Sequence, residues 1–265
     1  MNYNKYILAF ICISVFLSLC LLPSYICHAQ SAKIDSLQKV LLTAKEDTNK
    51  VNALNALSEQ LWKKGNYDTA LIYANNALAL ANSLSFGEGR GEAGWKKGIA
   101  KAYNNIGIIY QEQGNYPEAL KEHFASLKLK EELLEQAKRS GNPAALRESK
   151  QGIAASHNNI GLIYYEQGNY PEALKEYFAS LKLREEIAYK QGIAMSHNNI
   201  GIIYKEQGNY PEALKEYFAA LKLREEIGDK QGIAYSHNNI GDIYMEQGNY
   251  HQALKEHFAS LKIRE

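Results

Sequence analysis

Cysteine is nearly absent from the chain. The 265 residues include three cysteines, Cys12, Cys20 and Cys27, and all three lie within the first 30 residues. If that segment is removed, as argued below, the remaining chain can form no disulfide, no thiolate nucleophile and no cysteine metal site. A chain without thiols also suits an oxidising compartment, where a free thiol would be a liability.

The sequence also lacks a strong charge of either sign. There are 30 Lys and Arg residues against 29 Asp and Glu residues, so the formal net charge is +1. A nucleic-acid-binding protein would show a basic face or stripe, and we therefore expect no nucleic-acid partner. Apolar residues make up 46% of the chain, which is enough for a core and excludes disorder throughout.

No catalytic constellation is recognisable in the sequence. Paired carboxylates, a Ser/His/Asp set and a phosphate-binding loop are all missing, so we expect no enzyme, no cofactor and no bound metal. The glycine-rich stretch Ser85–Gly94 has the wrong glycine spacing for a Rossmann turn or a P-loop, and no predicted strand precedes it. It predicts a solvated loop between repeats.

The one long hydrophobic run is at the N-terminus. After Lys5, the 16 residues 7–22 are mostly apolar, Pro23 follows, and small residues precede Gln30. This pattern predicts a secretory signal peptide over residues 1–29 and export to the periplasm or out of the cell. The alternative is a membrane anchor formed by residues 7–22, although this run is shorter than the ~20 residues of a membrane-spanning helix. Contact with a membrane is expected only if this segment is retained or the chain continues.

The rest of the chain repeats one pattern. His-Asn-Asn-Ile-Gly begins at His157, His197 and His237, a period of 40 residues, and Tyr103 begins a variant copy. Each copy is followed by Ile-Tyr, Glu-Gln-Gly-Asn-Tyr and an Ala-Leu pair. A fixed period of this length is typical of a solenoid.

Each repeat is predicted to form two helices. One set of residues at helical spacing gives the buried face of a first helix: Ala194, His197, Ile200, Gly201 and Tyr204. A second set gives the apolar stripe of a second helix: Ala213, Leu214, Tyr217, Phe218 and Leu221. Between them, Gly208 can end the first helix in a left-handed conformation, and Pro211 suits the first turn of the second. One such pair cannot bury its stripes alone, so we expect pairs to stack.

The order of these residues resembles the tetratricopeptide repeat. The matching positions in one copy are Ile200, Gly201, Tyr204, Gly208, Tyr210, Ala213, Leu214, Tyr217, Ala220 and Leu221. The period is 40 rather than 34, and Glu185 and Glu225 stand where the family usually has a closing proline. This longer form with paired asparagines is similar to the repeats of kinesin light chains, Pins-type adaptors and bacterial sensor proteins. The resemblance implies an all-α, right-handed solenoid of stacked antiparallel helix hairpins.

The resemblance also implies a domain organisation. Residues 31–50 are expected to form an N-terminal capping helix, and residues 51–265 to form five repeats. The repeats are 51–84, 100–133, 154–187, 194–227 and 234–265. Insertions fall at 85–99 and 134–153, and in the second of these we expect both flanking helices to be lengthened into a protruding hairpin.

First helices line a concave groove in this family, which implies a peptide-binding site. The expected groove residues are Asn104, Asn158, Asn198, Asn238, Met195, Tyr235, Tyr165, Lys205, Asp242 and Met245. Because an amide side chain both donates and accepts hydrogen bonds, a ladder of asparagines could hold the backbone of an extended peptide whatever its sequence. The variable neighbours would set specificity. The alternative is that one asparagine of each pair joins neighbouring helices and the other is solvated.

The recurring histidines His157, His197 and His237 allow a metal site or a packing role. Neighbouring helices lie about 8–10 Å apart, whereas zinc needs its ligands at about 2.0–2.1 Å. Tyr103 occupies the same position in another repeat, so we expect packing. His123 and His257 alternate with tyrosines and are interpreted in the same way.

Mixed charge runs recur at the end of each predicted second helix. Lys182–Glu186 and Lys222–Glu226 are two of them. They predict a solvated outer face with ion pairs along the helix.

These features predict a non-catalytic scaffold that binds a protein or peptide segment in the groove. A rival interpretation is the extracytoplasmic input module of a longer signalling protein, such as a histidine kinase or a nucleotide cyclase, whose catalytic part would follow Glu265. The last repeat has no capping helix after it, and an uncapped solenoid end exposes an apolar face. This predicts self-association through the last repeat.

Overall fold

The computed structural model describes residues 32–85 and 92–264. The predicted signal peptide, 1–29, and the alternative anchor, 7–22, lie outside these residues. Every regular element in the described residues is a helix, and none of these helices combines the length and the apolar character that a membrane span requires.

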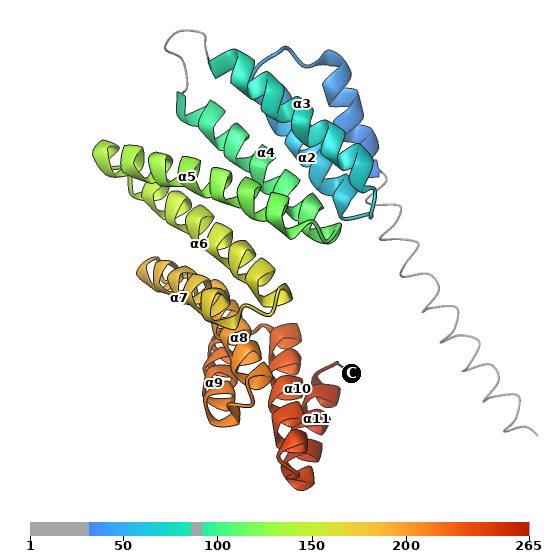
Figure 1. Cartoon of the computed structure of the whole chain (residues 1–265), viewed down its shortest axis with the longest axis vertical. Coiled ribbons are helices and arrows are strands. Elements are labelled where there is room, and N and C mark those ends of the chain that lie inside the picture. Colours follow the sequence, from blue (N-terminus) through green and yellow to red (C-terminus); the bar gives the residue numbers. More distant parts are fainter. Residues whose placement is uncertain (1–31, 86–91, 265) are drawn as a thin grey trace, which may run out of the picture. The chain divides into compact units, whose positions relative to one another are not determined.

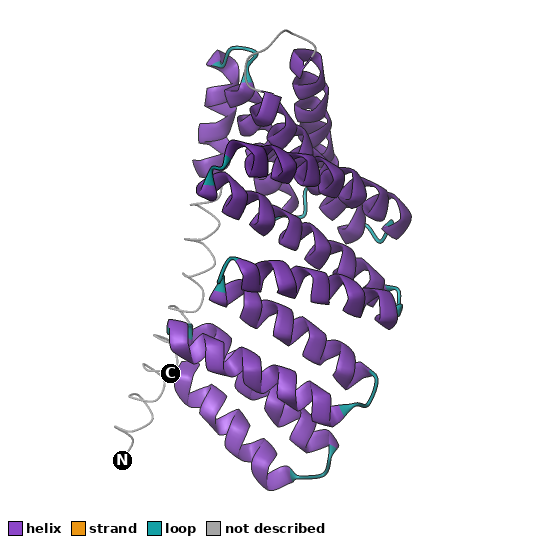
Figure 2. Cartoon of the chain, turned by 90° about the vertical axis from the view of Figure 1, so that its left-hand side faces the viewer, coloured by secondary structure: helices purple, strands orange, loops and turns teal. Residues whose placement is uncertain are grey.

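After a helix over residues 32–43, the helices form antiparallel pairs along the chain (Figures 1 and 2). The pairs are α2 (Thr48–Trp62) with α3 (Tyr67–Ser85), α4 (Glu92–Glu112) with α5 (Tyr116–Ser140), α6 (Pro143–Glu166) with α7 (Tyr170–Glu186), α8 (Lys190–Glu206) with α9 (Tyr210–Ile227), and α10 (Lys230–Glu246) with α11 (Tyr250–Arg264). The protein is an all-α solenoid of helical repeats, as predicted. It comprises two compact parts that divide between Asn105 and Ile106, within α4, and each part is described by itself.

The N-terminal helix is shorter than the predicted capping segment. It covers residues 32–43, and Ile34, Leu37 and Leu41 are half-buried as their spacing suggests, but Val40 is 45% exposed. The chain then turns, and the carboxylate of Asp47 accepts hydrogen bonds from the first amides of α2. Such a cap satisfies donors that the helix itself cannot pair.

The two insertions differ in structure. The glycine-rich stretch was expected to be a loop as far as Gly94. However, α4 begins at Glu92, so the last residues of the stretch are helical. In the second insertion, α5 has 25 residues and α6 has 24, as the predicted lengthened hairpin requires. Gly141 ends α5 in a left-handed conformation, and the Asn142 side chain accepts hydrogen bonds from the first amides of α6.

The turn inside each repeat is fixed by glycine. Gly208 has φ +71° and donates its amide to the carbonyl of Lys205, which ends α8. Pro211 follows in the first turn of α9, where its missing N–H costs no helical hydrogen bond. Both features agree with the sequence prediction.

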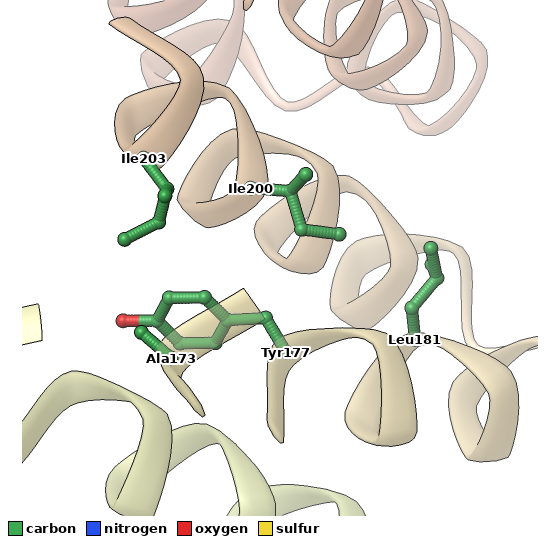
Figure 3. Close-up of a cluster of buried hydrophobic side chains, with 5 residues drawn as sticks. All are labelled: Ala173, Tyr177, Leu181, Ile200 and Ile203. Carbon is green, nitrogen blue, oxygen red and sulfur yellow. The ribbon is translucent and has the colours of Figure 1, made fainter. Parts of the chain in front are cut away.

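The core lies between the second helix of one repeat and the first helix of the next. Figure 3 shows one such cluster, in which Ala173, Tyr177 and Leu181 of α7 face Ile200 and Ile203 of α8. All five are at most 8% exposed, and burying one isoleucine contributes roughly 1.5–3 kcal/mol. The stacking of repeats therefore rests on hydrophobic contacts that one repeat cannot make alone.

The glycine of the His-Asn-Asn-Ile-Gly motif makes room for a ring of the same repeat. A Cβ atom at Gly161 would lie 2.8 Å from a ring carbon of Tyr177, and one at Gly107 would lie 2.9 Å from the ring of His123. The ring of His257 takes the same place against Gly241. The predicted packing role of His123 and His257 is confirmed.

One residue of the predicted second stripe is not in the core. Phe218 is 43% exposed, although Tyr217 beside it is 1% exposed. The stripe of α9 is therefore narrower than its apolar sequence suggests.

Candidate functional site

The paired asparagines are half-buried in α6, α8 and α10. We call the side of these helices that carries the first asparagine of each pair, Asn158, Asn198 or Asn238, the A-helix face. The Asn199 amide donates to the side-chain oxygen of Asn158 at 3.1 Å, and the Asn239 amide donates to that of Asn198 at 2.9 Å. In these two copies, the second asparagine of the motif thus binds the first asparagine of the preceding repeat. The alternative, in which one asparagine of each pair joins neighbouring helices and the other is solvated, therefore holds only in part, because the first asparagine also takes part in the bond between helices.

These hydrogen bonds use only part of the first asparagine. Asn158 and Asn198 accept through Oδ1, and their side chains are half-buried. An amide NH2 group is a donor of two hydrogen bonds. The NH2 groups of Asn158 and Asn198 are therefore the parts of the ladder that can face a ligand.

Asn104 belongs to the other compact part of the chain. There, the Asn105 amide donates to the backbone oxygen of Asn55 at 2.9 Å, and the Asn55 amide donates to the carbonyl of Gly98 at 3.0 Å. Asn104 is half-buried in α4. The predicted ladder within one compact part therefore consists of Asn158, Asn198 and Asn238.

Large apolar side chains lie at helical spacing from the first asparagines, on the same side of α8 and α10. Met195 is 41% exposed, Tyr235 is 53% exposed and Met245 is 50% exposed. The chain has three methionines including Met1, so both internal ones lie on the A-helix face. Methionine is flexible and polarisable, and it adapts to varied apolar partners.

The polar residues of this face, Lys205, Asp242 and Tyr165, differ in how much of each side chain is already in contact with another side chain. Lys205 lies 3.4 Å from Glu246 of the next first helix and its side chain is 26% exposed. The carboxylate of Asp242 is 41% exposed and lies 3.8 Å from His257, an imidazole that is charged only when protonated. Tyr165 stacks on Tyr170 with ring centroids 6.2 Å apart. Asp242 is therefore more available to a ligand than Lys205 or Tyr165.

The repeated histidines have a polar role that the sequence analysis missed. The Nδ1 atoms of His157, His197 and His237 lie 2.6, 2.6 and 2.7 Å from carboxylate oxygens. The partners are in the second helix of the same repeat: Glu176, Glu216 and Glu256. Each pair ties the two helices of one hairpin together, so the histidines do more than fill space. Within residues 32–85 and 92–264, no three His, Cys, Asp or Glu side chains are grouped as metal ligands.

The charge runs are only partly a solvated face. Arg184 is 4% exposed, and its guanidinium donates to the carbonyl of Gly192 at 3.0 Å and to the hydroxyl of Ser196 at 2.7 Å. Arg224 makes the same two bonds to the next first helix. These arginines link successive repeats, which corrects the prediction of an entirely solvated run.

Comparison with known proteins agrees with this architecture. Solenoids of stacked helix hairpins present extended surfaces that bind other proteins. The fold therefore supports a protein-interaction scaffold. The tetratricopeptide repeat family matches residues 99–138, 152–226 and 192–265, and the chain belongs to this family.

Several solved structures share the fold. BtubC (BKLC) from P. vanneervenii has 19% identity and a TM-score of 0.67, over 89% of both chains. A putative kinesin light chain of Podosopora anserina with nearly identical repeats has 13% identity and a TM-score of 0.60, over 83% of this chain and 97% of that one. Aspartyl phosphate phosphatase F from Bacillus subtilis has 12% identity and a TM-score of 0.63, over 89% of this chain and 68% of that one. At these identities the likeness shows the fold alone. No functionally curated protein matches the chain.

Proposed function

We propose that the protein is a non-catalytic scaffold whose A-helix face holds an extended peptide segment of a partner protein. The observation that carries this proposal is the use of only the side-chain oxygen of Asn158 and Asn198 in joining the repeats. Their NH2 groups recur once per repeat, and a peptide backbone offers carbonyl acceptors at regular intervals. The exposed Met195, Tyr235 and Met245 would contact the side chains of the bound segment.

The test begins with a selection of displayed random 12-residue peptides on the immobilised protein. The selected peptides are then measured by fluorescence anisotropy against Asn158→Asp/Asn198→Asp. Aspartate keeps an oxygen acceptor for the neighbouring repeat but replaces the NH2 donors by oxygen, so we expect binding to weaken by at least tenfold. This corresponds to about 1.4 kcal/mol, the scale of one or two hydrogen bonds.

The matched control is Asn75→Asp/Asn76→Asp, which adds the same two charges at exposed positions of α3. We expect it to leave affinity unchanged. If the selected peptides bind all three proteins equally well, the A-helix face is not the peptide site. Failure to select any peptide would count against the proposed function itself.

We also propose that the protein is exported, and the alternative function is that of an input module in a longer signalling protein. Cleavage after Ala29 would be read from the N-terminal sequence of the mature protein, and an intact N-terminus on a membrane-bound protein would favour the anchor instead. An input module of a longer signalling protein would use the same face to receive its peptide signal.

Self-association through the last repeat also stays a proposal. Leu254 and Leu261 of α11 are 57% and 53% exposed. The equivalent residues of α9, Leu214 and Leu221, pack in a cluster with Ile240 and Ile243 of α10. A second copy of the 265-residue chain could cover the α11 stripe in a similar way.

A further inference from the structure

All phenylalanines in the described residues lie at the surface. Phe124, Phe178 and Phe218 are each 43% exposed, and Phe258 is 63% exposed. They take the same position in α5, α7, α9 and α11, directly after the ring that packs against the glycine of the first helix. Successive residues of a helix are about 100° apart around its axis, so this position points away from that contact.

Two lysines accompany each phenylalanine, three residues before it and four residues after it. The pairs are Lys121 and Lys128, Lys175 and Lys182, Lys215 and Lys222, and Lys255 and Lys262, and all eight side chains are exposed. Residues at these spacings share one side of a helix. Each of the four helices α5, α7, α9 and α11 therefore presents a Lys-Phe-Lys row, and we call the four rows together the B-helix face.

The fold does not require these residues. In α3, the second helix of the first repeat, Asn75 stands at the phenylalanine position, and Ile72 and Ala79 stand at the lysine positions; all three are exposed. A polar residue is therefore compatible with this site in a second helix. Exposed large apolar side chains that recur on one side of successive helices, with charged residues beside them, are candidates for an interaction surface.

The exposed lysines of the B-helix face favour a partner that carries negative charge. Lys121 and Lys175 lie 3.0 and 3.2 Å from Glu118 and Glu172, but exposed pairs of this kind are weak and compete poorly with a ligand. One exposed carboxylate, Glu185 or Glu225, lies seven residues after Phe178 or Phe218, on the same side of its helix. It interrupts the positive surface in these two rows, which disfavours a uniform polyanion such as a nucleic acid or an anionic membrane.

We propose that the B-helix face binds an acidic amphipathic segment of a partner protein. Its apolar side chains would pack against Phe178 and Phe218, and its carboxylates would pair with the flanking lysines. This site is separate from the A-helix face and does not depend on the peptide binding proposed there.

The experiment is a selection of displayed random 16-residue peptides on the full chain, with Phe178→Asn/Phe218→Asn as counter-target. This variant copies the residue at position 75, and circular dichroism checks that it is folded. We expect peptides that prefer the wild type to carry a net negative charge and at least two large apolar residues. Their affinity should fall at least tenfold in the phenylalanine variant and in a second variant, Lys182→Glu/Lys222→Glu.

The reversed-charge variant allows a stronger test. A peptide whose acidic residues are changed to lysine should bind Lys182→Glu/Lys222→Glu at least fivefold better than it binds the wild type. The proposal is overturned if no peptide prefers the wild type, or if those that do are basic or uncharged. It is equally overturned if only a 20-nucleotide single-stranded DNA or vesicles of phosphatidylserine and phosphatidylcholine bind in a phenylalanine-dependent way. Loss of binding in Asn158→Asp/Asn198→Asp alone would assign the peptides to the A-helix face and would also contradict the proposal.

Discussion

Replacement of Ala188 by glycine should stabilise the protein. Ala188 follows α7 with φ +50°, and Gly228 takes the same place after α9 with φ +69°. The left-handed region destabilises a residue with a Cβ atom by roughly 1–2 kcal/mol. Glycine avoids this cost, but it lowers stability by about 0.4–1 kcal/mol because it makes the unfolded chain more disordered. The difference predicts a net gain of about 1 kcal/mol for Ala188→Gly.

The assay is thermal unfolding followed by circular dichroism. For a chain of this size, about 1 kcal/mol corresponds to a rise in melting temperature of roughly 2–4 °C. Hydrogen exchange adds a local reading, because the amides of Ala188 and Tyr189 donate to the last carbonyls of α7 at 2.9 and 3.0 Å, and we expect their exchange to slow about fivefold. The matched variant Gly228→Ala should lower the melting temperature by a similar amount. An unchanged or lower melting temperature for Ala188→Gly would refute the argument from backbone strain.

Three further changes test other parts of the structure. Arg184→Lys should lower the free energy of unfolding by about 1–2 kcal/mol, because an ammonium group can keep the bond to the Ser196 hydroxyl but loses the bond to the Gly192 carbonyl; urea denaturation measures this. Burial lowers the pKa of His123 to about 4, below its ordinary value of 6.5, so the unfolded chain takes up a proton before the folded protein does. Stability should therefore fall by about 3 kcal/mol between pH 6.5 and 4 through this residue, and His123→Tyr should remove that part of the pH dependence. Leu254→Glu/Leu261→Glu should abolish the concentration-dependent association that we expect in sedimentation of the 265-residue chain.

Each of these predictions has a control and a contrary result. Arg139→Lys changes an exposed arginine and should stay within ~0.5 kcal/mol of the wild type; an equal loss in both variants would mean that the Arg184 contacts contribute nothing specific. If His123→Tyr follows the wild-type stability curve from pH 7 to pH 4, His123 does not govern acid sensitivity. A wild-type chain that sediments as a monomer at every concentration would remove the self-association proposal.

Periodicity predicted the fold well because it reports directly on burial. Residues such as Ile200 and Tyr204 recur on one side of a helix, and Gly201 recurs with them on the predicted buried face. The structure adds what fills that space, which is the ring of Tyr217 in the same repeat, with a ring carbon 2.7 Å from where a Cβ of Gly201 would lie.

The polar contacts could not be predicted in the same way. His157 and Glu176 are 19 residues apart in the sequence, and their 2.6 Å contact depends on how the two helices of a hairpin align. Arg184 stands in a charge run that is typical of a solvated surface, yet its length lets the guanidinium reach the next repeat. Phe218 was predicted to belong to the apolar stripe of the second helix, but it is 43% exposed whereas Tyr217 is 1% exposed. Which of two adjacent rings is buried depends on how α9 is rotated about its axis against its neighbours.

NMR on protein labelled with nitrogen-15 in asparagine would show whether the asparagine NH2 groups of the A-helix face bind a peptide backbone. The side-chain NH2 signals of Asn158 and Asn198 would be followed while a peptide selected on the wild type is added to saturation. We expect both signals to shift and those of Asn75 and Asn76 to stay unchanged. If the protein is saturated with peptide and neither the Asn158 nor the Asn198 signal shifts, these NH2 groups do not bind the peptide backbone.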